Sequence, residues 1–311
     1  MQIFVSGSLA FDRIMSFPGR FSDHILPDKI HILNVCFVVD GMEEKFGGTA
    51  GNIAYNLALL GERPLIVGCA GRDFAPYAAW LEKLGLPLSG IRVIEEDFTA
   101  GAYITTDQAD NQITGFNPAA MRHSSRFDFA AVDPNDSLVI VSPGNVEDMC
   151  GHPRVCRKLG IPYVFDPGQQ ITVLSGAQLA EAVEGSLALV TNDYELELIK
   201  KATELDTEQL LGLTRAIVTT LGEQGSRIVQ KNIVTEVPAV PARTVADPTG
   251  AGDAFRAGLL KGLAQGLTLP EAARLGSTCA SFAVEHKGTQ VHCFTDAEFS
   301  ARFASRFGRT A

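Results

Sequence analysis

Both the fold and the chemistry of this chain are indicated by one stretch, Asp247-Pro248-Thr249-Gly250-Ala251-Gly252-Asp253-Ala254-Phe255. Pro248 fixes one backbone angle, whereas Gly250 and Gly252 permit bends that a side chain would forbid. The small and apolar residues from Ala254 to Leu263 then predict a packed helix. The stretch therefore reads as a turn that leads into the N-terminus of a buried helix.

The start of a helix can hold an anion, because its first N–H groups have no partner within the helix and its dipole is positive there. The backbone of Gly250, Ala251 and Gly252 is nearly bare, so a phosphate group could approach it closely. Asp253 would lie beside that phosphate, where a carboxylate can take a proton from an attacking hydroxyl. We therefore predict a phosphoryl-transfer site with Asp253 as general base. The alternative is a glycine-rich loop in which Asp253 merely caps a helix.

A second glycine-rich stretch, Gly47-Gly48-Thr49-Ala50-Gly51-Asn52, precedes a helix that we expect from Ile53 to Leu60, closed by Gly61. Asn52 has two possible roles. It either caps the helix or bonds the local backbone, or it bonds a hydroxyl of a ligand that approaches the double glycine. The residues alone leave both roles open.

Composition and charge exclude several classes of protein. The chain has 311 residues, of which 46% are hydrophobic and 20% charged, as in a soluble globular protein. A net charge of −10 argues against a nucleic-acid partner, because such surfaces are basic. The sequence has no apolar run long enough to span a bilayer and no basic segment before an apolar stretch at the N-terminus, so we expect no membrane partner.

Cysteine usage points to a reducing cytoplasm, since the six cysteines show no paired framework. Cys150, His152 and Cys156 lie close together in the sequence. No second group of ligands accompanies them, which disfavours a metal site there.

The order of predicted elements indicates an α/β fold with a doubly wound, mostly parallel sheet flanked by helices. The predicted strands are Gln2–Leu9, Pro64–Ala70, Ile91–Ile94, Leu138–Ser142, Tyr163–Asp166, Leu187–Thr191 and Ile217–Thr220. The predicted helices between them are Phe74–Leu84, Val146–Leu159, Gly176–Glu184 and Tyr194–Thr203.

A small separate sheet interrupts this alternation. Ala100–Thr106 and Gln112–Asn117 predict a hairpin, which a strand near Ile14 and the alternating stretch Lys29–Val39 could extend. We therefore expect a single domain, residues 1–311, with a lid sub-domain formed by about residues 13–46 and 98–118.

Polar residues follow several predicted strands, and ligands bind at the carboxyl ends of strands in open α/β sheets. Ser8 and Asp12 follow the first strand, and Asp12 is either a loop residue or a ligand for two hydroxyls of a sugar. Asp166–Gln170, Asn192–Glu195 and Thr220–Gly225 follow later strands. Each of these alone would be a turn, but together they would converge on one crevice.

The chain resembles the ribokinase-like (PfkB) family of sugar and nucleoside kinases over roughly residues 1–295. Asp247–Phe255 resembles the family's C-terminal signature, and Gly47–Gly61 resembles its N-terminal signature, about 200 residues earlier. The resemblance implies that the backbone of Gly250, Ala251 and Gly252 forms an anion hole, and that Asp253 activates the acceptor hydroxyl. It also implies a lid that closes over the acceptor and often forms a dimer contact.

The resemblance further implies ATP as co-substrate and Mg²⁺ as cofactor. Asn192-Asp193-Tyr194-Glu195 matches an Asn-x-x-Glu motif whose Asn and Glu organise Mg²⁺ and phosphates, usually through water. The stretch that lies along ATP is matched by Thr220, Gly222 and Gly225. A loop for a monovalent cation such as K⁺ is matched by Asp247 and Thr249 with the backbone of Ala283, His286 and Gly288. His292 stands where an oxygen ligand is common, which weakens the case for potassium.

Within the family, the chain is most similar to bacterial adenosine and nucleoside kinases. This likeness is carried by Phe17–Ser22, Leu26-Pro27, Asp166–Gln170, Asn192–Glu195 and Gly288-Thr289-Gln290. It implies that the nucleoside is held by Ser8, Asp12, Gly47, Gly48, Asn52 and Gln169, with Phe116 stacked on the base. Ala102 departs from the second aromatic residue expected beside the base, which suggests a looser pocket that also takes inosine or guanosine.

We therefore expect a cytoplasmic enzyme, homodimeric through its lid, that converts ATP and a nucleoside into ADP and a nucleoside 5′-monophosphate. Arg256 could reach a phosphate, but an exposed position on the helix surface is the expectation. One alternative is a sugar kinase of the same family acting on a ribose-like acceptor. Another is a nucleoside-binding protein without catalysis. A Rossmann dehydrogenase is disfavoured, because no Gly-x-Gly-x-x-Gly follows the first strand.

Overall fold

The computed structural model describes residues 1–32, 34–231 and 233–308. These residues form a nine-stranded sheet with the order β13-β12-β11-β10-β9-β8-β1-β4-β5. Strands β11 to β5 in this order are parallel, and β12 and β13 add an antiparallel edge. The bounds are β1 Gln2–Ser6, β4 Leu65–Gly71, β5 Ile91–Ile94, β8 Ser137–Val141, β9 Tyr163–Phe165, β10 Ala188–Asn192, β11 Ile217–Thr220, β12 Ser226–Gln230 and β13 Ile233–Val237.

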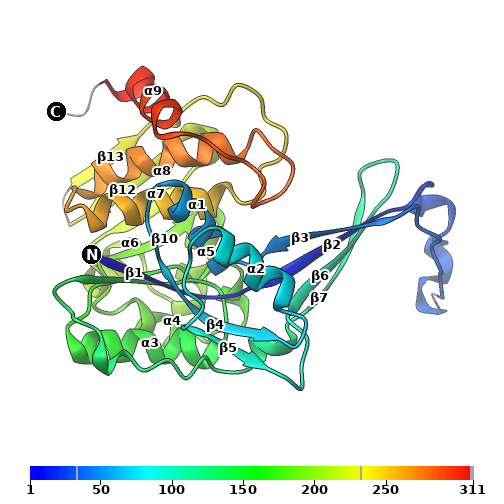
Figure 1. Ribbon diagram of the computed structural model, residues 1–311, viewed down its shortest axis with the longest axis horizontal. Coiled ribbons are helices and arrows are strands. Elements are labelled where there is room, and N and C mark those ends of the chain that lie inside the picture. Colours follow the sequence, from blue (N-terminus) through cyan, green and yellow to red (C-terminus); the bar gives the residue numbers. More distant parts are fainter. Residues whose placement is uncertain (33, 232, 309–311) are drawn as a thin grey trace.

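Helices cover both faces of this sheet, as Figure 1 shows. Helices α7, α8 and α9 lie on one side, and α3 and α4 on the other. The bounds are α1 Thr49–Leu59, α2 Ala75–Lys83, α3 Val146–Leu159, α4 Gly176–Val183, α5 Asp193–Thr203, α6 Thr207–Leu213, α7 Ala251–Ala264, α8 Leu269–Ala283 and α9 Asp296–Phe307.

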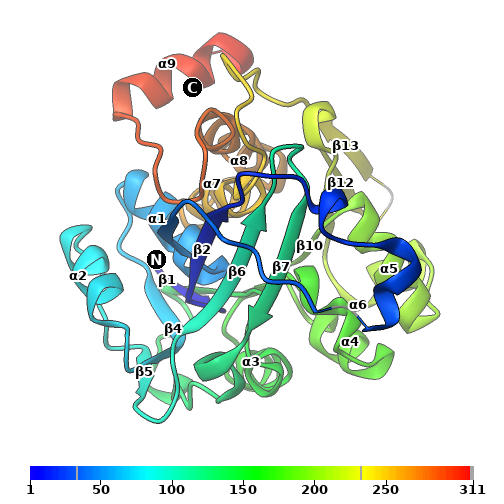
Figure 2. The ribbon, with the colours of Figure 1, turned by 90° about the vertical axis from the view of Figure 1, so that its right-hand side faces the viewer.

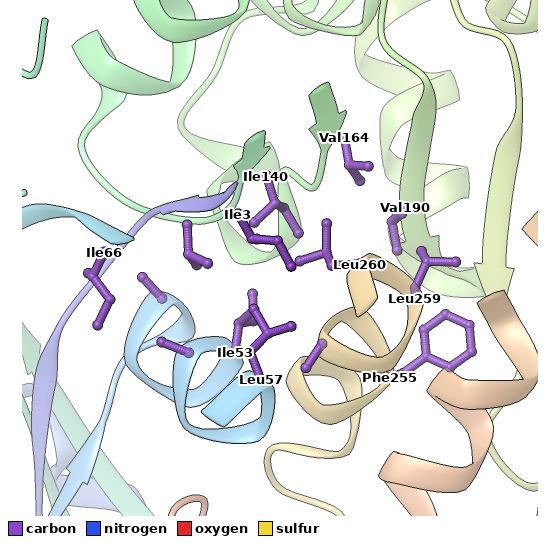
Figure 3. Packing of buried hydrophobic residues seen from close by; sticks show 14 of the residues in the cluster. Ile3, Ile53, Leu57, Ile66, Ile140, Val164, Val190, Phe255, Leu259 and Leu260 are labelled. Atoms are coloured by element: carbon purple, nitrogen blue, oxygen red, sulfur yellow. The ribbon is translucent and has the colours of Figure 1, made fainter. Parts of the chain in front are cut away.

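The central strands consist mostly of apolar residues, since both faces of the sheet are buried and successive side chains point to opposite faces. In β8, for example, Leu138 and Ile140 belong to the core under α1 and α7, whereas Val139 and Val141 belong to the core under α3. Figure 3 shows the first of these cores, where Ile53 of α1 and Leu260 of α7 pack against the sheet. This packing fixes α1 and α7 side by side, with both N-termini at the same edge of the sheet.

The small sheet projects from one side of the body (Figure 1) and faces the viewer in Figure 2. Its order is β3-β2-β6-β7, with bounds β2 Ala10–Ser16, β3 Met42–Gly47, β6 Ala100–Thr106 and β7 Gln112–Asn117. Pairs β2–β3 and β6–β7 are antiparallel, and β2–β6 is parallel. A cluster of aromatic rings at its far end, Phe17, Phe21, His24 and Phe37, gives this extension a small core of its own.

The predicted strand Lys29–Val39 is wrong. Its first residues belong to a 3₁₀ helix, Pro27–Ile32, position 33 lies outside the described residues, and the fourth strand of the small sheet is β3 instead. The alternating apolar residues of this stretch are typical of a strand, but no sheet packs against them. Ile30, Ile32 and Val38 are 62%, 66% and 78% exposed.

The other predicted strands and helices are confirmed within a few residues at each end. The largest boundary error lies at α1, which begins at Thr49 rather than Ile53. The antiparallel edge β12–β13 and helices α6, α8 and α9 were not predicted. Among the described residues, the helices are all too short or too polar to cross a lipid bilayer.

The strand order places a crevice beside β1, because the chain proceeds from β1 to β4 in one direction and from β8 to β9 in the other. Ligands of open α/β sheets bind at such a switch point, at the carboxyl ends of the strands. Ser8, which follows β1, and Pro143, which follows β8, meet there through a backbone hydrogen bond of 2.9 Å from the Ser8 N–H to the Pro143 carbonyl.

Candidate active site

A cavity of 1320 Å³ opens at these carboxyl ends, with the small sheet on one side and the N-terminus of α7 on the other. A site for one small ligand usually measures about 300–1,000 Å³, so this cavity has room for two. The predicted site residues that line it are Ser8, Asp12, Gly48, Asn52, Phe116, Gln169, Asn192, Glu195, Thr220, Gly222, Gly225, Thr249, Gly250, Ala251, Gly252 and Asp253.

A few predicted site residues lie behind the wall of the cavity. Gly47 is one of them, and a Cβ at this position would meet Asp12 Oδ2 at 2.6 Å. Gly47 therefore leaves room for the Asp12 carboxylate. The others belong to the predicted cation loop and are Asp247, Ala283, His286 and Gly288.

The turn before α7 has the predicted form. Gly250 occupies the N-cap with φ 80°, a left-handed conformation that favours glycine, and α7 begins at Ala251. The first turn of the helix therefore opens into the cavity, where its N–H groups and its dipole can hold an anion. Asp253 lies in that first turn.

The carboxylate of Asp253 accepts a hydrogen bond of 2.9 Å from Nδ2 of Asn52. Burial raises the pKa of Asp253 to about 7, and this effect exceeds the opposing influence of Arg256 and of the Asn52 hydrogen bond. The carboxylates of Asp166 and Glu195 raise the pKa further. A base with a pKa near the operating pH is suited to accept a proton from a hydroxyl.

Asn52 is held in one orientation by a chain of hydrogen bonds. Its Oδ1 accepts a bond of 3.1 Å from Nε2 of Gln290, which also contacts the Tyr77 hydroxyl at 2.6 Å. The indole N–H of Trp80 donates to Oε1 of Gln290 at 3.0 Å. Because the N-cap of α1 is Gly48, the capping interpretation of Asn52 is wrong, and its side chain instead points at Asp253. Gln290, Tyr77 and Trp80 were missed as members of the site.

The small sheet presents a row of side chains to the cavity. Asp12 in β2 is paired with Lys45 in β3 and Ala102 in β6, and Ala102 is paired in turn with Phe116 in β7. Asp12, Ala102 and Phe116 all line the cavity, and the ring of Phe116 is 53% exposed. Burial raises the pKa of Asp12 to about 6, despite the nearby charge of Lys45.

The remaining wall is formed by the ends of β10 and β11. Gly225 needs φ 97°, and a Cβ there would lie 2.1 Å from the Val237 carbonyl oxygen. Gly222 has φ 57° with open space around it. Position 225 therefore accepts only glycine without distortion of the backbone. This turn carries Thr220 and lies across the cavity from α7.

Arg256 is not on the surface, contrary to the prediction. Its side chain is 9% exposed and forms a bidentate ion pair with the buried carboxylate of Asp166, in which Nη2 donates to Oδ1 at 2.7 Å. Its Nη2 also lies 4.0 Å from Glu195 Oε2. The sequence held one signal of this position, because an arginine in a helix of small apolar residues must find a partner if that helix is buried.

Comparison with known proteins agrees with this geometry. A model of the pfkB family of carbohydrate kinases matches residues 23–296. The chain belongs to the PfkB family. It has the ribokinase-like fold and is a phosphotransferase with an alcohol group as acceptor.

The PfkB relatives include proteins with different acceptors. The nucleoside kinase of Methanocaldococcus jannaschii is 32% identical over 266 residues, which cover 83% of this chain and 85% of that protein. The inositol 3-kinase of Arabidopsis thaliana is 48% identical over 259 residues, covering 79% and 69%. The structure of the Burkholderia thailandensis nucleoside kinase in complex with inosine is 38% identical, covers 98% of both chains and has a TM-score of 0.86.

A magnesium ion fits this PfkB site. Asn192 and Glu195 form a reciprocal capping box at the start of α5, in which Glu195 Oε2 accepts from the Asn192 N–H at 2.8 Å. Within the described residues no cluster of three or more His, Cys, Asp and Glu could enclose a metal alone. Mg²⁺ commonly keeps several waters and binds through one or two carboxylates and substrate phosphates, which matches the Glu195 carboxylate that this capping box holds at the cavity wall.

The donor set of the predicted cation loop does not fit a monovalent ion as well. Asp247 already accepts N–H bonds from Thr249 at 2.9 Å and Gly288 at 3.1 Å. Nζ of Lys45 reaches the Lys287 carbonyl at 3.4 Å, so an ammonium group already lies at this turn. His292 turns its Nε2 to Asn56 at 2.8 Å.

Proposed function

We propose that this protein is an ATP-dependent nucleoside kinase that phosphorylates the ribose 5′-hydroxyl of adenosine and other purine nucleosides. One observation carries the proposal. A single cavity joins a buried carboxylate at a helix N-terminus, Asp253, to a second carboxylate and an aromatic ring, Asp12 and Phe116, on the small sheet. Asp253 is suited to phosphoryl transfer, Asp12 to binding a ribose, and Phe116 to stacking on a base. The nucleoside kinase relatives support this choice of acceptor.

In the proposed mechanism, Asp12 accepts hydrogen bonds from two ribose hydroxyls, with Ser8, Gly48, Asn52 and Gln169 around the rest of the sugar. Asp253 takes the proton of the 5′-hydroxyl. The oxygen of this hydroxyl attacks the γ-phosphorus of ATP, and ADP leaves. The N–H groups of residues 250–253 stabilise the negative charge on the transferred group.

ATP lies along the turn of Thr220, Gly222 and Gly225 in this proposal. Asn192 and Glu195 would hold Mg²⁺, mostly through water, and the bound ion would neutralise charge on the phosphates. Because Asp247 and the turn at Gly288 are held by protein groups, we propose that K⁺ is not required. Equal turnover in potassium, sodium and Tris buffers would support this, and strong activation by K⁺ alone would contradict it.

The base pocket should accept more than adenosine. Ala102 is the cross-strand neighbour of Phe116 on the same face of the small sheet, so a base stacked on Phe116 would meet a methyl group, rather than a second aromatic ring, next to it. The small side chain leaves space for the 6-oxo group of inosine and guanosine. The Burkholderia thailandensis relative in its complex with inosine is consistent with this.

The deciding experiment measures ADP release with Mg²⁺-ATP and a panel of acceptors: adenosine, inosine, guanosine, cytidine, ribose and myo-inositol. We expect kcat/KM for purine nucleosides to exceed the value for ribose by about 10- to 10²-fold, since base stacking is worth about 1–3 kcal/mol per base. Higher activity with ribose or inositol would replace the proposal with a sugar or polyol kinase. If none of these acceptors stimulates ADP release, the protein would instead be a nucleoside-binding protein without catalysis.

We also propose that residues 13–46 and 98–118 act as a lid sub-domain of one kinase domain, and that two lids form a homodimer. Met42, Tyr103 and Ile113 share the sheet face turned away from Asp12 and are 59%, 40% and 46% exposed. Such a face favours association. Light scattering should give twice the chain mass of 33.3 kDa. Ile113→Glu should give the monomer, and Val155→Glu on α3 should not.

A further inference from the structure

A buried arginine lies next to the proposed general base. Arg256 is one turn of α7 beyond Asp253, and it also lines the cavity. Its guanidinium pairs with Asp166, which follows β9 and is 1% exposed, and approaches Glu195 of α5 at 4.0 Å. The buried guanidinium of Arg256 is thus close to the carboxylates of Asp166, Glu195 and Asp253, which come from three different elements.

The backbone at the anion site is adapted to this cation. A Cβ at position 252 would lie 2.7 Å from Nη1 of Arg256. Because the guanidinium is fixed by its ion pair with Asp166, it could not easily move aside. Gly252 is therefore needed for the arginine as well as for the approach of a phosphate.

We propose that Arg256 is a positioning residue for phosphoryl transfer: anchored by Asp166, it balances the charges of Asp253 and Glu195 on either side of the transferring phosphate. This inference rests on the proposed function. The cavity must receive a triphosphate, and Asp166, Glu195 and Asp253 would repel it if no cation lay among them. Arg256 reduces that repulsion and favours the ionised form of the base.

A purely structural role is the rival explanation, since the ion pair also ties α7 to the end of β9. Removing either partner would destabilise the fold in both cases, because a buried charge would be left alone. The two explanations differ in the pH dependence of catalysis. Only a charge that Asp253 senses can move the acidic limb of the kcat/KM profile.

The groups that face Asp253 define the expected shifts. They are Asn52 of α1, which is neutral, Tyr77 of α2, Asp166 after β9, Glu195 of α5 and Arg256 on its own helix. Loss of Arg256 removes the cation, so the acidic limb should move to higher pH by about one unit. Loss of the Asp166 charge removes a neighbouring anion, so the limb should move to lower pH.

The experiment compares pH profiles of kcat/KM for wild type, Arg256→Met, Asp166→Asn, Arg256→Met/Asp166→Asn and Arg256→Lys. Arg302→Met is the matched control, because Arg302 pairs with Glu285 at 2.9 Å with both side chains 10% exposed, but it lies on α9 outside the cavity wall. Rates are normalised to the folded fraction measured by circular dichroism.

We expect opposite shifts for Arg256→Met and Asp166→Asn, an intermediate limb for the double variant and an unshifted limb for Arg256→Lys and Arg302→Met. We also expect kcat of Arg256→Met to fall by about 10–10²-fold beyond the loss in Arg302→Met. If Arg256→Met does not fold, the double variant, which also lacks the Asp166 carboxylate, is compared with Asp166→Asn. The acidic limb of the double variant should then lie at higher pH than that of Asp166→Asn.

Profiles that all coincide with wild type would overturn the inference, as would a loss of kcat no larger than in the control. Failure of the proposed function looks different, because wild type itself would then show no nucleoside-dependent ADP release.

Discussion

The side-chain amide of Asn52 donates a hydrogen bond of 2.9 Å to the carboxylate of Asp253, across 201 positions of the sequence. The two residues belong to the first turns of α1 and α7, which pack against each other on one face of the sheet. The two glycine-rich stretches therefore form one site rather than two. Their contact places the proposed base beside the proposed ribose subsite.

Asp253→Asn tests the base directly. The substitution keeps the size of the side chain and removes its ability to accept a proton, so kcat should fall by about 10²–10⁴-fold or more. KM for the nucleoside should change little, since the pocket shape is kept. Steady-state kinetics give both values, and near-wild-type turnover would remove Asp253 from this role.

The pH dependence of the wild-type enzyme should show an acidic limb near neutrality. Asp253 accepts a proton only when it is ionised, and its pKa is raised to about 7, so kcat/KM should decrease as pH falls through this value. Asp12, with a pKa of about 6, should weaken nucleoside binding only at lower pH. A profile that stays flat from pH 8 to pH 5 would contradict the assignment.

The same raised pKa predicts a stability effect. Between the ordinary carboxyl pKa of 3.8 and about 7, folded Asp253 holds a proton that the unfolded chain has lost, so stability decreases as pH rises through this window. The cost is complete above pH 7. Asp253→Asn should therefore melt several degrees above wild type at pH 8 and show no such gain below pH 4. Calorimetry at both pH values measures the difference, and an equal gain at both would refute the burial explanation.

Gln290→Ala tests the support of Asn52. Without the amide of Gln290, the Asn52 carboxamide can rotate and its bond to Asp253 is no longer fixed. We expect kcat/KM to fall by about 10-fold, the scale of about 1.4 kcal/mol. Trp80→Phe, which removes the indole donor to Gln290 together with part of the ring but leaves the Gln290 amide in place, should give a smaller loss. Equal activity of Gln290→Ala and wild type would show that Asn52 needs no such support.

Gly48→Ala separates a close backbone approach from a backbone angle. Gly48 has φ 85°, and a Cβ would meet the Ser8 carbonyl oxygen at 2.6 Å. Gly61 has a similar φ of 80° with open space around it, so Gly61→Ala carries the strain alone. We expect about 1 kcal/mol of lost stability for Gly61→Ala and clearly more for Gly48→Ala, measured by urea unfolding. Equal losses would mean that the loop relaxes without cost.

Much of the fold followed from local patterns, because buried parallel strands are continuous apolar runs and the helices between them carry normal caps. Helix α8 was missed although Thr268 and Glu271 form a capping box before it, which was a readable signal. The edge strands β12 and β13 were harder to predict, since their sequences, Ser226–Gln230 and Ile233–Val237, do not alternate strictly between apolar and polar residues. The stretch Lys29–Val39 had the pattern of a strand but no partner strand or covering face.

The site was less completely predictable. The glycines and Asp253 could be recognised because their chemistry depends on adjacent residues. Gln290 and Trp80 could not, and the buried position of Arg256 was missed, because their roles depend on partners 90 to 238 positions away. Long-range partners of this kind leave no periodic mark on a sequence.

The row of Asp12, Ala102 and Phe116 lies on the small sheet, whereas Asp253 lies on α7 and the residues proposed to bind ATP lie at or just after the ends of β10 and β11 in the large sheet. In the proposed mechanism, recognition of the base and delivery of the phosphoryl group are thus carried by separable pieces of the architecture. Evolution could retarget such an enzyme to a new alcohol by exchanging a few strand residues, with no change to the machinery that activates ATP.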